Sequence, residues 1–467
     1  MKQLCFDTKT FWSLESIQNI MTSLVAPSPI HELARASRVA SRNSYATVDE
    51  RNLALLSVKQ SLLSNKDAII AANLIDVERE KKKGTCSEAL MKRLVLSDAK
   101  FDSLITGIEG VLNLPDPNGK ISLARELDEG LELYRVSCPI GVLCVIFEAR
   151  PDAAVQIASL AIKSANSVIL KGGSEAIESN RILIQVIREG LINAGTAVPV
   201  DAVQLVATRQ DIAQLLDLDE YIDLVIPRGS NALVKHIKAN TKIPVMGHAD
   251  GICSVYIDND ADVEKAINIA IDSKINYPAA CNACEKLLIH RECLGSLLPQ
   301  IGKAMEQAGV TMHADPTCMK YLPSSCTVAS TEEDWKTEYL CLEIAVKCVE
   351  NVEEAIQHIN THGSGHTDCI VTENNAKAEM FMKRIDSAGV YHNASTRFAD
   401  GFRYGFGAEV GVSTNRIHAR GPVGLEGLTT YKYRMYGNGQ CCAEFGDGDG
   451  KKRYTHKSLE KKLPIKN

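Results

Sequence analysis

The sequence predicts an α/β protein of two domains, each built on a parallel sheet that helices cover on both faces. The chain has 467 residues, which is more than one ordinary hydrophobic core accommodates. Short runs that are apolar throughout alternate with stretches of helical periodicity, as expected for strands that are buried on both faces. The runs in the first half are IGVLCVIF (140–147), SVILKG (167–172), AVQLV (202–206), YIDLVIP (221–227) and IPVMG (243–247).

The segment before these runs is predicted to be mostly helical. Residues 30–43, 48–82 and 88–112 are charged and apolar-periodic, and no proline interrupts them. The turn-rich stretch LNLPDPNGK (112–120) then ends the helical pattern. LELYRVSCP (131–139), which follows it, is expected to be extended.

The alternation continues in the second half and predicts a second sheet. The two domains are expected to meet near residues 248–251, where the sequence GHADG is typical of a hinge. The elements expected after this point are strands at ICSVYID (252–258), KLLIH (286–290) and LEIAVKCV (342–349), with helices at 261–273 and 294–308.

Composition and charge exclude several classes of protein. The net charge of −6 and the pI near 6.0 argue against a nucleic-acid-binding surface, which is normally basic. No apolar run approaches the roughly eighteen residues of a membrane span. The early residues match neither a signal peptide nor a transit peptide. Fifteen cysteines lie singly in apolar segments, as reduced thiols do, so a cytoplasmic location is expected.

Two strand-to-helix corners in the first half are candidate phosphate-binding sites. Free N–H groups at helix N-termini bind anions, and ligands of parallel sheets lie beyond the carboxyl ends of the strands. The residues are Lys171, Gly172, Gly173 and Ser174 at one corner, and Arg228, Gly229 and Ser230 at the other. Ser174 is expected to cap the helix that follows it. Ordinary turn chemistry explains each corner alone, but two corners with a cation each favour a nucleotide.

A pair of cysteines in YPAACNACEK (277–286) marks a candidate reactive centre in the second half. Pro278 precedes Cys281, and a helix is expected to begin there and to continue through NACEKLL (282–288). A helix N-terminus favours the thiolate form of a cysteine, and its free N–H groups can hold an oxyanion. This placement predicts that Cys281 is a nucleophile; the alternative is a buried structural cysteine.

Two further interpretations of the cysteine pair remain open. On one helix, Cys281 and Cys284 would lie one turn apart, so mild oxidation could join them, whereas a packing role for Cys284 is the plainer alternative. A zinc site would need more ligands, and the nearest candidates are His358, His362 and His366. A Gly-Ser-Gly sequence breaks their helix before the third histidine, so no metal is expected.

The sequence resembles the γ-glutamyl phosphate reductases, a family of the aldehyde dehydrogenase superfamily, from about residue 30 to residue 437. Long stretches carry the resemblance, which makes it specific. They are CPIGVLCVIFEARPDAAVQIASLAIKSANSVILKGGSEA (138–176), IPRGSNALV (226–234), NYPAACNA (276–283), VENVEEAIQHINTHGSGHTDCI (349–370) and YHNASTRFADGFRYGFGAEVGVSTNRIHARGPVGLEGLTTYK (391–432).

The resemblance implies an aldehyde-dehydrogenase-like fold with a Rossmann-type cofactor domain, a catalytic domain and a small β element for oligomerisation. The expected division is an N-terminal extension (1–29), an NADP-binding domain (30–125 and 139–249), a catalytic domain (250–400), an oligomerisation element (126–138 and 426–440) and a loose, Gly-rich and then basic tail (441–467). A homo-oligomer is expected, because β ribbons outside both sheets have open edges that a second subunit can pair.

The resemblance also implies the reaction. It is the NADPH-dependent reduction of L-glutamate 5-phosphate to L-glutamate 5-semialdehyde with release of phosphate, the second step of proline biosynthesis from glutamate. Cys281 is the implied nucleophile with Asn282 beside it in the catalytic site, and Glu338 is an implied cofactor contact. The cations expected to hold the substrate are Arg150, Arg397, Arg416 and His418. Structural ion pairs are the alternative for each of them.

Two departures from other aldehyde dehydrogenases refine this expectation. Relatives that prefer NAD place a glutamate where this chain has Ser174, which would not repel the 2′-phosphate of NADP. Hydrolytic relatives keep a glutamate where this chain has MGHADG (246–251), so phosphate-coupled reduction is favoured. The alternatives are an NAD(P)-dependent dehydrogenase of another small aldehyde and an inactive homologue that serves as a scaffold. A separate glutamate 5-kinase is a possible partner; nucleic acid and membrane are not expected.

Overall fold

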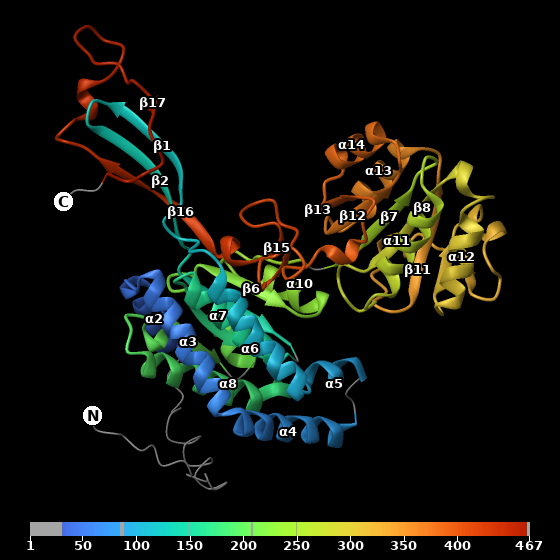
Figure 1. The fold of residues 1–467 in the computed structure, drawn as a ribbon, viewed down its shortest axis with the longest axis horizontal. Coiled ribbons are helices and arrows are strands. Elements are labelled where there is room, and N and C mark those ends of the chain that lie inside the picture. The colour runs from blue at the N-terminus through green and yellow to red at the C-terminus, as the bar shows by residue number, and fades with distance from the viewer. Residues whose placement is uncertain (1–29, 85–87, 149, 207–208, 249, 465–467) are drawn as a thin grey trace, which may run out of the picture.

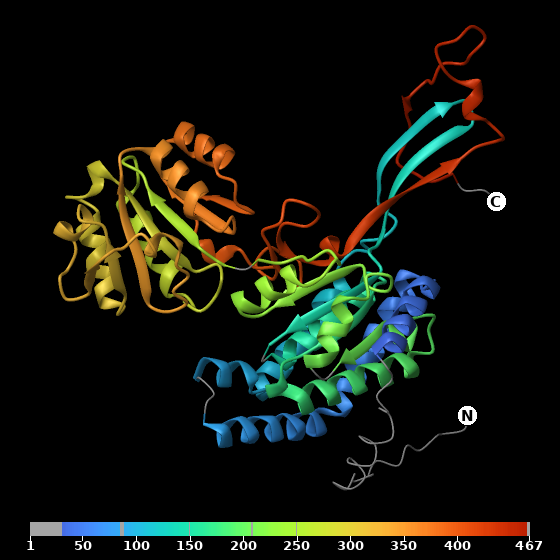
Figure 2. The ribbon, with the colours of Figure 1, turned by 180° about the vertical axis from the view of Figure 1, so that it is seen from behind.

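The computed structural model describes residues 30–84, 88–148, 150–206, 209–248 and 250–464, which form two α/β domains and a long β ribbon. The ribbon and the second domain both extend from the first domain, in different directions (Figures 1 and 2). Within the described residues, no helix combines the length and hydropathy that crossing a bilayer requires. The two sheets confirm the expected α/β architecture.

The first domain is built on four parallel strands in the order β5-β4-β3-β6. Its strands are β3 (Val142–Phe147), β4 (Ser167–Lys171), β5 (Val203–Val206) and β6 (Leu224–Arg228). The helices that follow them are α7 (Pro151–Lys163), α8 (Ile177–Ala194), α9 (Arg209–Leu216) and α10 (Asn231–Ala239). Every residue of β3 and β4 is buried, which explains why these runs are apolar throughout.

The expected strand IPVMG forms only a single bridge, in which Val245 faces Val225. The backbone N–H of Val225 donates to the carbonyl of Pro244, and that of Met246 donates to Val225. Because Pro244 has no N–H of its own, the pairing does not extend into a ladder. The prediction of a full strand here was wrong.

The N-terminal helices number more than the sequence indicates. They are α2 (Ile30–Asn43), α3 (Val48–Ser64), α4 (Lys66–Lys83), α5 (Glu88–Leu94) and α6 (Asp98–Asn113). The expected helix 48–82 breaks at Asn65, whose side chain donates to the carbonyl of Ser61. The expected helix 88–112 breaks before Ser97, whose hydroxyl accepts the backbone N–H of Lys100. Asn and Ser interrupt both helices by offering the backbone local hydrogen bonds that compete with the helix.

Helices α3 and α8 pack so closely that the contact depends on a glycine. A Cβ atom added at Gly190 would lie 2.6 Å from the Cα atom of Val58, a backbone atom that no rotamer change can move. We expect Gly190→Ala to destabilise the fold by about 1–3 kcal/mol. The matched control is Gly107→Ala in α6, where nothing lies within 4 Å and alanine should stabilise by up to about 1 kcal/mol. Urea unfolding followed by circular dichroism measures the free energy of unfolding of both variants. Equal changes in the two variants would contradict the importance of the Gly190 contact.

The second domain is built on seven parallel strands in the order β10-β9-β11-β8-β7-β12-β13. Its strands are β7 (Cys253–Ile257), β8 (Cys284–His290), β9 (Thr311–Ala314), β10 (Thr327–Ala329), β11 (Glu343–Val349), β12 (Thr367–Val371) and β13 (Gly389–His392). The helices are α11 (Val263–Ile275), α12 (Leu298–Gln307), α13 (Val352–His362) and α14 (Asn375–Arg384). Strands β8, β7 and β12 are neighbours at the centre, and this adjacency positions the candidate site.

The ribbon is an antiparallel sheet in the order β16-β2-β1-β17. Its strands are β1 (Ile121–Asp128), β2 (Leu131–Pro139), β16 (Thr429–Tyr436) and β17 (Lys457–Ser458). The described part of the C-terminal tail is therefore not loose. It pairs with β1 through β17, and Leu459 and Leu463 pack against the cluster formed by Ala124, Tyr134 and Val136. These apolar contacts hold a segment whose glycines and lysines predicted mobility.

The segment between the second domain and the ribbon returns the chain to the first domain. It contains the two-stranded pair β14 (Gly411–Ser413) and β15 (Gly421–Val423). Val410 and Val423 belong to the core of the first domain. The side-chain amide of Asn415 donates to the carbonyl of Val245 at 2.8 Å. This return segment contributes directly to the site described next.

Candidate active site

The candidate nucleophile lies where three adjacent strands of the second domain begin. Cys281 precedes β8, Gly251 precedes β7 and His366 precedes β12. Because β8, β7 and β12 are parallel neighbours, residues that precede them gather at one edge of the sheet. This edge also receives His248 from the segment that joins the two domains. The sheet topology thus assembles a site from residues far apart in sequence.

Cys281 lies in a turn and not at the start of a helix. Helix α11 ends at Ile275, Tyr277 has a positive φ of 64°, and strand β8 begins at Cys284. Backbone N–H groups of Ala280 and Ala283 close successive turns around Cys281. The prediction of a helix that begins at Cys281 and continues through NACEKLL (282–288) was therefore wrong, and a helix dipole does not act on this thiol.

The strand predicted at KLLIH (286–290) is present, but β8 begins two residues earlier, at Cys284, and the failure to predict this earlier start has a physical cause. β8 carries Glu285 and Lys286, both fully buried, and charged residues are depleted in strands. Glu285 forms an ion pair with Lys274 of α11 at 2.6 Å, and both side chains are fully buried. The ammonium group of Lys286 donates to the carbonyl of Trp335 at 3.3 Å. Partners from distant segments, which the local sequence does not reveal, make these buried charges tolerable.

The turn that carries Cys281, residues 276–283, is called the nucleophile turn below. It packs directly on the segment before β7. A Cβ atom added at Gly251 would lie 2.1 Å from the carbonyl oxygen of Cys281 and 2.6 Å from its Cα atom. From the other side, the thiol of Cys253 donates to the same carbonyl at 3.4 Å. Backbone contacts on two sides therefore fix the position of Cys281.

Two histidines face the thiol. One ring nitrogen each of His248 and His366 lies with the Cys281 Sγ atom in a group whose members are all within 4.8 Å of one another. The two rings meet edge-on, with centroids 5.0 Å apart. Burial lowers the pKa of His248, which favours the neutral imidazole. Neither histidine was predicted as a catalytic or binding residue. His248 precedes β7 and His366 precedes β12, and both strands belong to the same sheet.

The hydrogen bond of His248 leaves one of its ring nitrogens with an available lone pair, and His366 has a ring nitrogen without a partner among the described residues. His248 Nδ1 lies 2.9 Å from the carbonyl oxygen of Val412 and must donate to it, which leaves Nε2 as an acceptor. His366 is fully buried, and its Nδ1 atom lies 3.0 Å from the Thr367 hydroxyl. Its Nε2 atom has no hydrogen-bond partner among the described residues.

The geometry contradicts the proposed Cys281–Cys284 helix pair. Cys284 is fully buried in β8, its thiol donates to the carbonyl of Lys286, and burial raises its pKa to about 12. The two cysteines lie in a turn and a strand, so they are not one helical turn apart. His358 and His362 lie together on α13 with ring centroids 4.6 Å apart, and the group with Cys281 contains only His366 of the three.

Residues 395–399 support the nucleophile turn from the other side. The amide of Asn282 donates to the carbonyl of Ala399 at 2.9 Å, and the Thr396 hydroxyl donates to the carbonyl of Asn282 at 2.7 Å. Arg397 is almost fully buried; burial and Arg403 lower its pKa, and Cys281 opposes this. The loop thus holds Asn282 in place and brings the Arg397 guanidinium within electrostatic reach of the thiol.

The other predicted substrate cations are distributed differently. Burial, Arg228 and Arg93 lower the pKa of Arg150, and Tyr277 of the nucleophile turn opposes this. Arg150 is therefore within electrostatic reach of Arg228 at the second corner and of Tyr277, and Asp152 of α7 also opposes the lowering of its pKa. Arg416 is exposed and paired with Asp386, and His418 donates to the carbonyl of Gly427 in its own loop. Their roles toward substrate stay predictions, as does a role for Arg93, which the sequence did not indicate.

The first corner lies at the carboxyl end of β4, as expected, but Ser174 does not cap a helix. The backbone N–H groups of Glu178 and Ser179 donate instead to the buried carboxylate of Asp76 in α4. A distant carboxylate therefore satisfies the start of α8. Ser174 is exposed, and the Arg79 guanidinium donates to its carbonyl at 3.2 Å.

The second corner, at the end of β6, carries a carboxylate. Glu148 accepts the backbone N–H of Ser230 at 3.0 Å, and its carboxyl carbon would lie 2.7 Å from a Cβ atom at Gly229. Arg228 lies 3.7 Å from the carboxylate of Glu409. One N–H group expected to bind phosphate is therefore already paired, and the cofactor contacts at both corners stay predictions.

Glu338 lies near the nucleophile turn. Burial raises its pKa, whereas the backbone N–H of Gly251 and the ring of His248 favour its charged form. The backbone N–H of Leu340 donates to Glu285, so the buried Lys274–Glu285 pair anchors the loop that carries Glu338. The buried pair of Lys274 and Glu285 therefore has a structural role, although a charged residue such as Glu285 is unusual in a buried strand.

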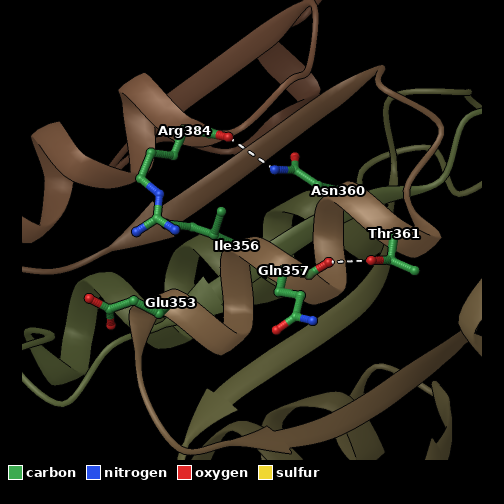
Figure 3. Close-up of a pocket in the computed structure, with 6 residues that line it drawn as sticks. All are labelled: Glu353, Ile356, Gln357, Asn360, Thr361 and Arg384. Atoms are coloured by element: carbon green, nitrogen blue, oxygen red, sulfur yellow. Dashed lines mark hydrogen bonds between the residues drawn. The ribbon is translucent and has the colours of Figure 1, made fainter.

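A separate surface hollow lies between α13 and α14 (Figure 3). Asn360 donates to the carbonyl of Arg384, and the Thr361 hydroxyl donates to the carbonyl of Gln357. The hollow is lined by Glu353, Ile356, Gln357, Asn360, Thr361 and Arg384. The first contact joins α13 to α14 and the second lies within α13, and the residues that line the hollow include none of the site residues discussed above.

Comparison with known proteins identifies the family. The aldehyde dehydrogenase family model matches residues 30–320 and 328–429. A probable γ-glutamyl phosphate reductase of Schizosaccharomyces pombe is 52% identical over 419 residues, which cover 88% of this chain and 92% of that protein. The chain belongs to the γ-glutamyl phosphate reductases of the aldehyde dehydrogenase family. It is therefore an oxidoreductase, and membership of this family implies a nicotinamide cofactor.

Further relatives agree with this family assignment. The γ-glutamyl phosphate reductase of Acetivibrio thermocellus is 49% identical, and the match covers 93% of this chain and all of that protein. The crystal structure of the γ-glutamyl phosphate reductase of Thermotoga maritima superposes with a TM-score of 0.85 at 40% identity, covering 89% of this chain and 100% of that one. The resemblance and the fold class predicted from sequence are confirmed.

Proposed function

We propose that this chain reduces L-glutamate 5-phosphate to L-glutamate 5-semialdehyde, releases phosphate, and so catalyses the second step of proline biosynthesis. The observation that carries the proposal is the environment of Cys281. Two histidines face its thiol, and the segment 246–251 that packs on it holds no glutamate to activate water. The names of the relatives, which match over nearly their whole length, give the same reaction.

The residues of the site support a thioester mechanism. A ring nitrogen of His248 or His366 takes the thiol proton, and the Cys281 sulfur attacks the carbonyl of the acyl phosphate. The C–O bond to phosphate breaks, and phosphate leaves with its bonding electrons. A nicotinamide cofactor, when bound, supplies the hydride that reduces the acyl group. The C–S bond then breaks, and the released thiolate recovers a proton from the histidine.

Cations and backbone groups orient the substrate in this scheme. We assign Arg397 and Arg150 to the negative groups of the substrate, because both approach the nucleophile turn from different domains. Arg416 and His418 are weaker candidates, since each is committed to a partner in its own surroundings. Asn282 positions the turn through its amide bond to Ala399.

The cofactor is proposed to be NADP. Ser174 carries no charge that would repel a 2′-phosphate, Lys171 precedes it by three residues, and Arg79, which pairs with Asp76, donates to its carbonyl. Arg79 lies on α4, far from Ser174 in the chain, and was not among the cofactor residues predicted from the sequence. Lys171 and Arg79 would hold the 2′-phosphate, with Glu338 as the contact at the nicotinamide end.

Cofactor preference tests this assignment. We expect Ser174→Glu to shift preference from NADP toward NAD by like-charge repulsion. Arg79→Gln should lower kcat/KM for NADP relative to NAD by about tenfold, the equivalent of one charge-assisted hydrogen bond. The control is Arg181→Gln, since Arg181 pairs with Glu178 of the same helix, α8. Constant kcat/KM ratios in all three variants would remove Ser174 and Arg79 from the cofactor site.

We further propose a homo-oligomer that forms through the ribbon. The edge of β16 that does not face β2 has no partner strand among the described residues, and Tyr431, Tyr433 and Met435 on it are more than half exposed. Open edges with apolar side chains are pairing surfaces. We expect light scattering to give a multiple of 50.9 kDa at micromolar concentration. A monomeric mass contradicts this expectation.

A cytoplasmic location and a separate kinase as a partner are also part of this proposal. Every cysteine in the described part of the chain is a free thiol, which favours the reducing cytoplasm. A separate glutamate 5-kinase must supply the acyl phosphate, and transfer between the two enzymes would protect this labile compound from water.

The decisive experiment runs the reaction in reverse. Purified enzyme with NADP and glutamate 5-semialdehyde should form NADPH only when phosphate is added, because phosphate must cleave the thioester. An ordinary aldehyde dehydrogenase forms NADPH without phosphate. An inactive homologue forms none under either condition.

A further inference from the structure

The group formed by His248, Cys281 and His366 has the donor set of a metal site. Their ligand atoms lie within 4.8 Å of one another, and they come from three separate segments of the second domain and its hinge. In a tetrahedral zinc site with bonds of about 2.0–2.3 Å, neighbouring ligand atoms are about 3.3–3.8 Å apart. A small inward movement of the side chains therefore suffices to bring all three into bonding distance.

A hydrogen bond prepares His248 as a ligand, and His366 offers a ring nitrogen that has no partner among the described residues. His248 donates through Nδ1 to the carbonyl of Val412, which directs the Nε2 lone pair away from that bond. Metal-ligating histidines almost always donate their second ring nitrogen in this way. His366 is fully buried, and its Nε2 atom is without a partner in the described structure. A buried polar atom without a partner costs about 1–3 kcal/mol unless a ligand satisfies it.

The chemistry of the donors selects the ion. Two imidazole nitrogens and one thiolate suit Zn²⁺, whereas Mg²⁺ and Ca²⁺ require oxygen ligands, which the group lacks. Cys281 and His248 are half-buried, so an ion has access from solvent. Three protein ligands leave the fourth position of a tetrahedral ion open to water.

We propose that Zn²⁺ binds reversibly to His248, Cys281 and His366 and inhibits the enzyme by occupying its nucleophile. On binding, the Cys281 thiol loses its proton to solvent and the sulfur lone pair forms the bond to zinc. That sulfur can then no longer attack a carbonyl, and removal of zinc by a chelator restores the thiol. The site rests on the positions of three side chains and does not depend on which substrate the enzyme reduces.

The test measures metal binding directly, so it is independent of the reaction. All proteins carry Cys341→Ser, Cys441→Ser and Cys442→Ser, because these exposed thiols could bind zinc on the surface. Zn²⁺ affinity is measured by competition with a chromophoric chelator, and Co²⁺ is used as a spectroscopic probe of sulfur ligation. We expect one tight zinc site per chain, release of a proton on binding, and a sulfur-to-cobalt charge-transfer band.

Three ligand variants and one control decide the outcome. Cys281→Ser, His248→Asn and His366→Asn should each weaken zinc binding by at least about tenfold, and Cys281→Ser should abolish the cobalt band. His236→Asn, which changes an exposed histidine on α10, should bind as the parent does. If burial prevents His366→Asn from folding, the half-buried His248 still decides. Equal zinc affinity in the parent, His248→Asn and Cys281→Ser would overturn the proposal.

Inhibition is checked separately from binding. Zinc should slow alkylation of Cys281 by iodoacetamide, and a chelator should reverse this protection; the modified residue is identified by mass spectrometry. Mg²⁺ at the same concentration should give no protection. If the reductase assay fails but zinc protects Cys281, the proposed function is wrong and the metal site stands. If the reductase is active and zinc gives no protection, the metal site is wrong.

Discussion

Cys281→Ser is expected to lower the rate of acyl-phosphate reduction by about a thousandfold or more while cofactor binding is unchanged. A serine hydroxyl ionises far less readily than a thiol, and the alkoxide is not available at neutral pH. Loss of a nucleophile that acts together with its base removes most of the catalytic effect at once. Single-turnover kinetics and fluorescence titration with the cofactor measure the two properties separately.

The neighbouring thiols provide controls for this variant. Cys284 and Cys253 are fully buried, and burial raises the pKa of both thiols, so neither should replace Cys281 as nucleophile. Cys341→Ser, which changes an exposed cysteine far from the turn in sequence, should retain full activity. If Cys281→Ser turns over at a rate comparable to the parent, the assignment of the nucleophile is wrong.

The overall architecture could be predicted because its signals are local. Strands β3 and β4 are buried on both faces, and their runs of apolar residues are visible without knowledge of any partner. The ribbon was also visible, since LELYRVSCP corresponds to β2 and its alternation matches a sheet outside the domain cores. The pattern of apolar residues along a segment indicates which of its faces are buried. These strands could be predicted because their burial follows from that local pattern.

The errors occurred where distant partners decide the local structure. Glu285 is tolerated in β8 because Lys274 pairs with it, and Asp76 replaces Ser174 as the cap of α8. The described part of the tail follows the ribbon because Leu459 and Leu463 pack against an apolar cluster there. In each case the relevant neighbour lies elsewhere in the chain, so no window of sequence contains the information.

The candidate site was half predicted for the same reason. Cys281 stands out in sequence, since a Pro and two Ala lead into it and a second Cys follows. His248 and His366 acquire significance only once β7, β8 and β12 are known to be neighbours in that order. Ligands usually bind at the carboxyl ends of parallel strands, and this rule predicts binding residues in the first domain. In the second domain the residues gather at the amino ends, so the rule gave no indication of them.

This arrangement also explains why a thiol away from any helix N-terminus can serve as nucleophile. In the proposed mechanism, one of the two histidines accepts the thiol proton, so no helix dipole is needed to stabilise the thiolate. Backbone contacts from Gly251 and Cys253 hold the turn, so the sulfur and its base keep a fixed relation. The activity should therefore depend on the close backbone contact as strongly as on the histidines.

Gly251→Ala tests this dependence and is expected to lower kcat by about a hundredfold or more. Its Cβ atom would lie 2.1–2.7 Å from the carbonyl oxygen, Cα and carbonyl carbon of Cys281, and these backbone atoms have to move. A displacement of about 1 Å at a reacting group can cost a hundredfold in rate. We also expect a loss of about 1–3 kcal/mol in the free energy of unfolding, as for overpacking elsewhere.

Gly247→Ala is the matched control in the same segment. There the nearest atoms to an added Cβ, all from Pro227, lie 3.5–3.6 Å away, which is ordinary van der Waals contact. Neither glycine needs a left-handed backbone, so the two variants differ in the contact with Cys281 and not in conformational strain. Steady-state rates and thermal unfolding of both variants, with cofactor binding as a check on the first domain, measure the effect. If Gly251→Ala retains the activity of Gly247→Ala, the turn adjusts without cost and its rigid support is not part of the mechanism.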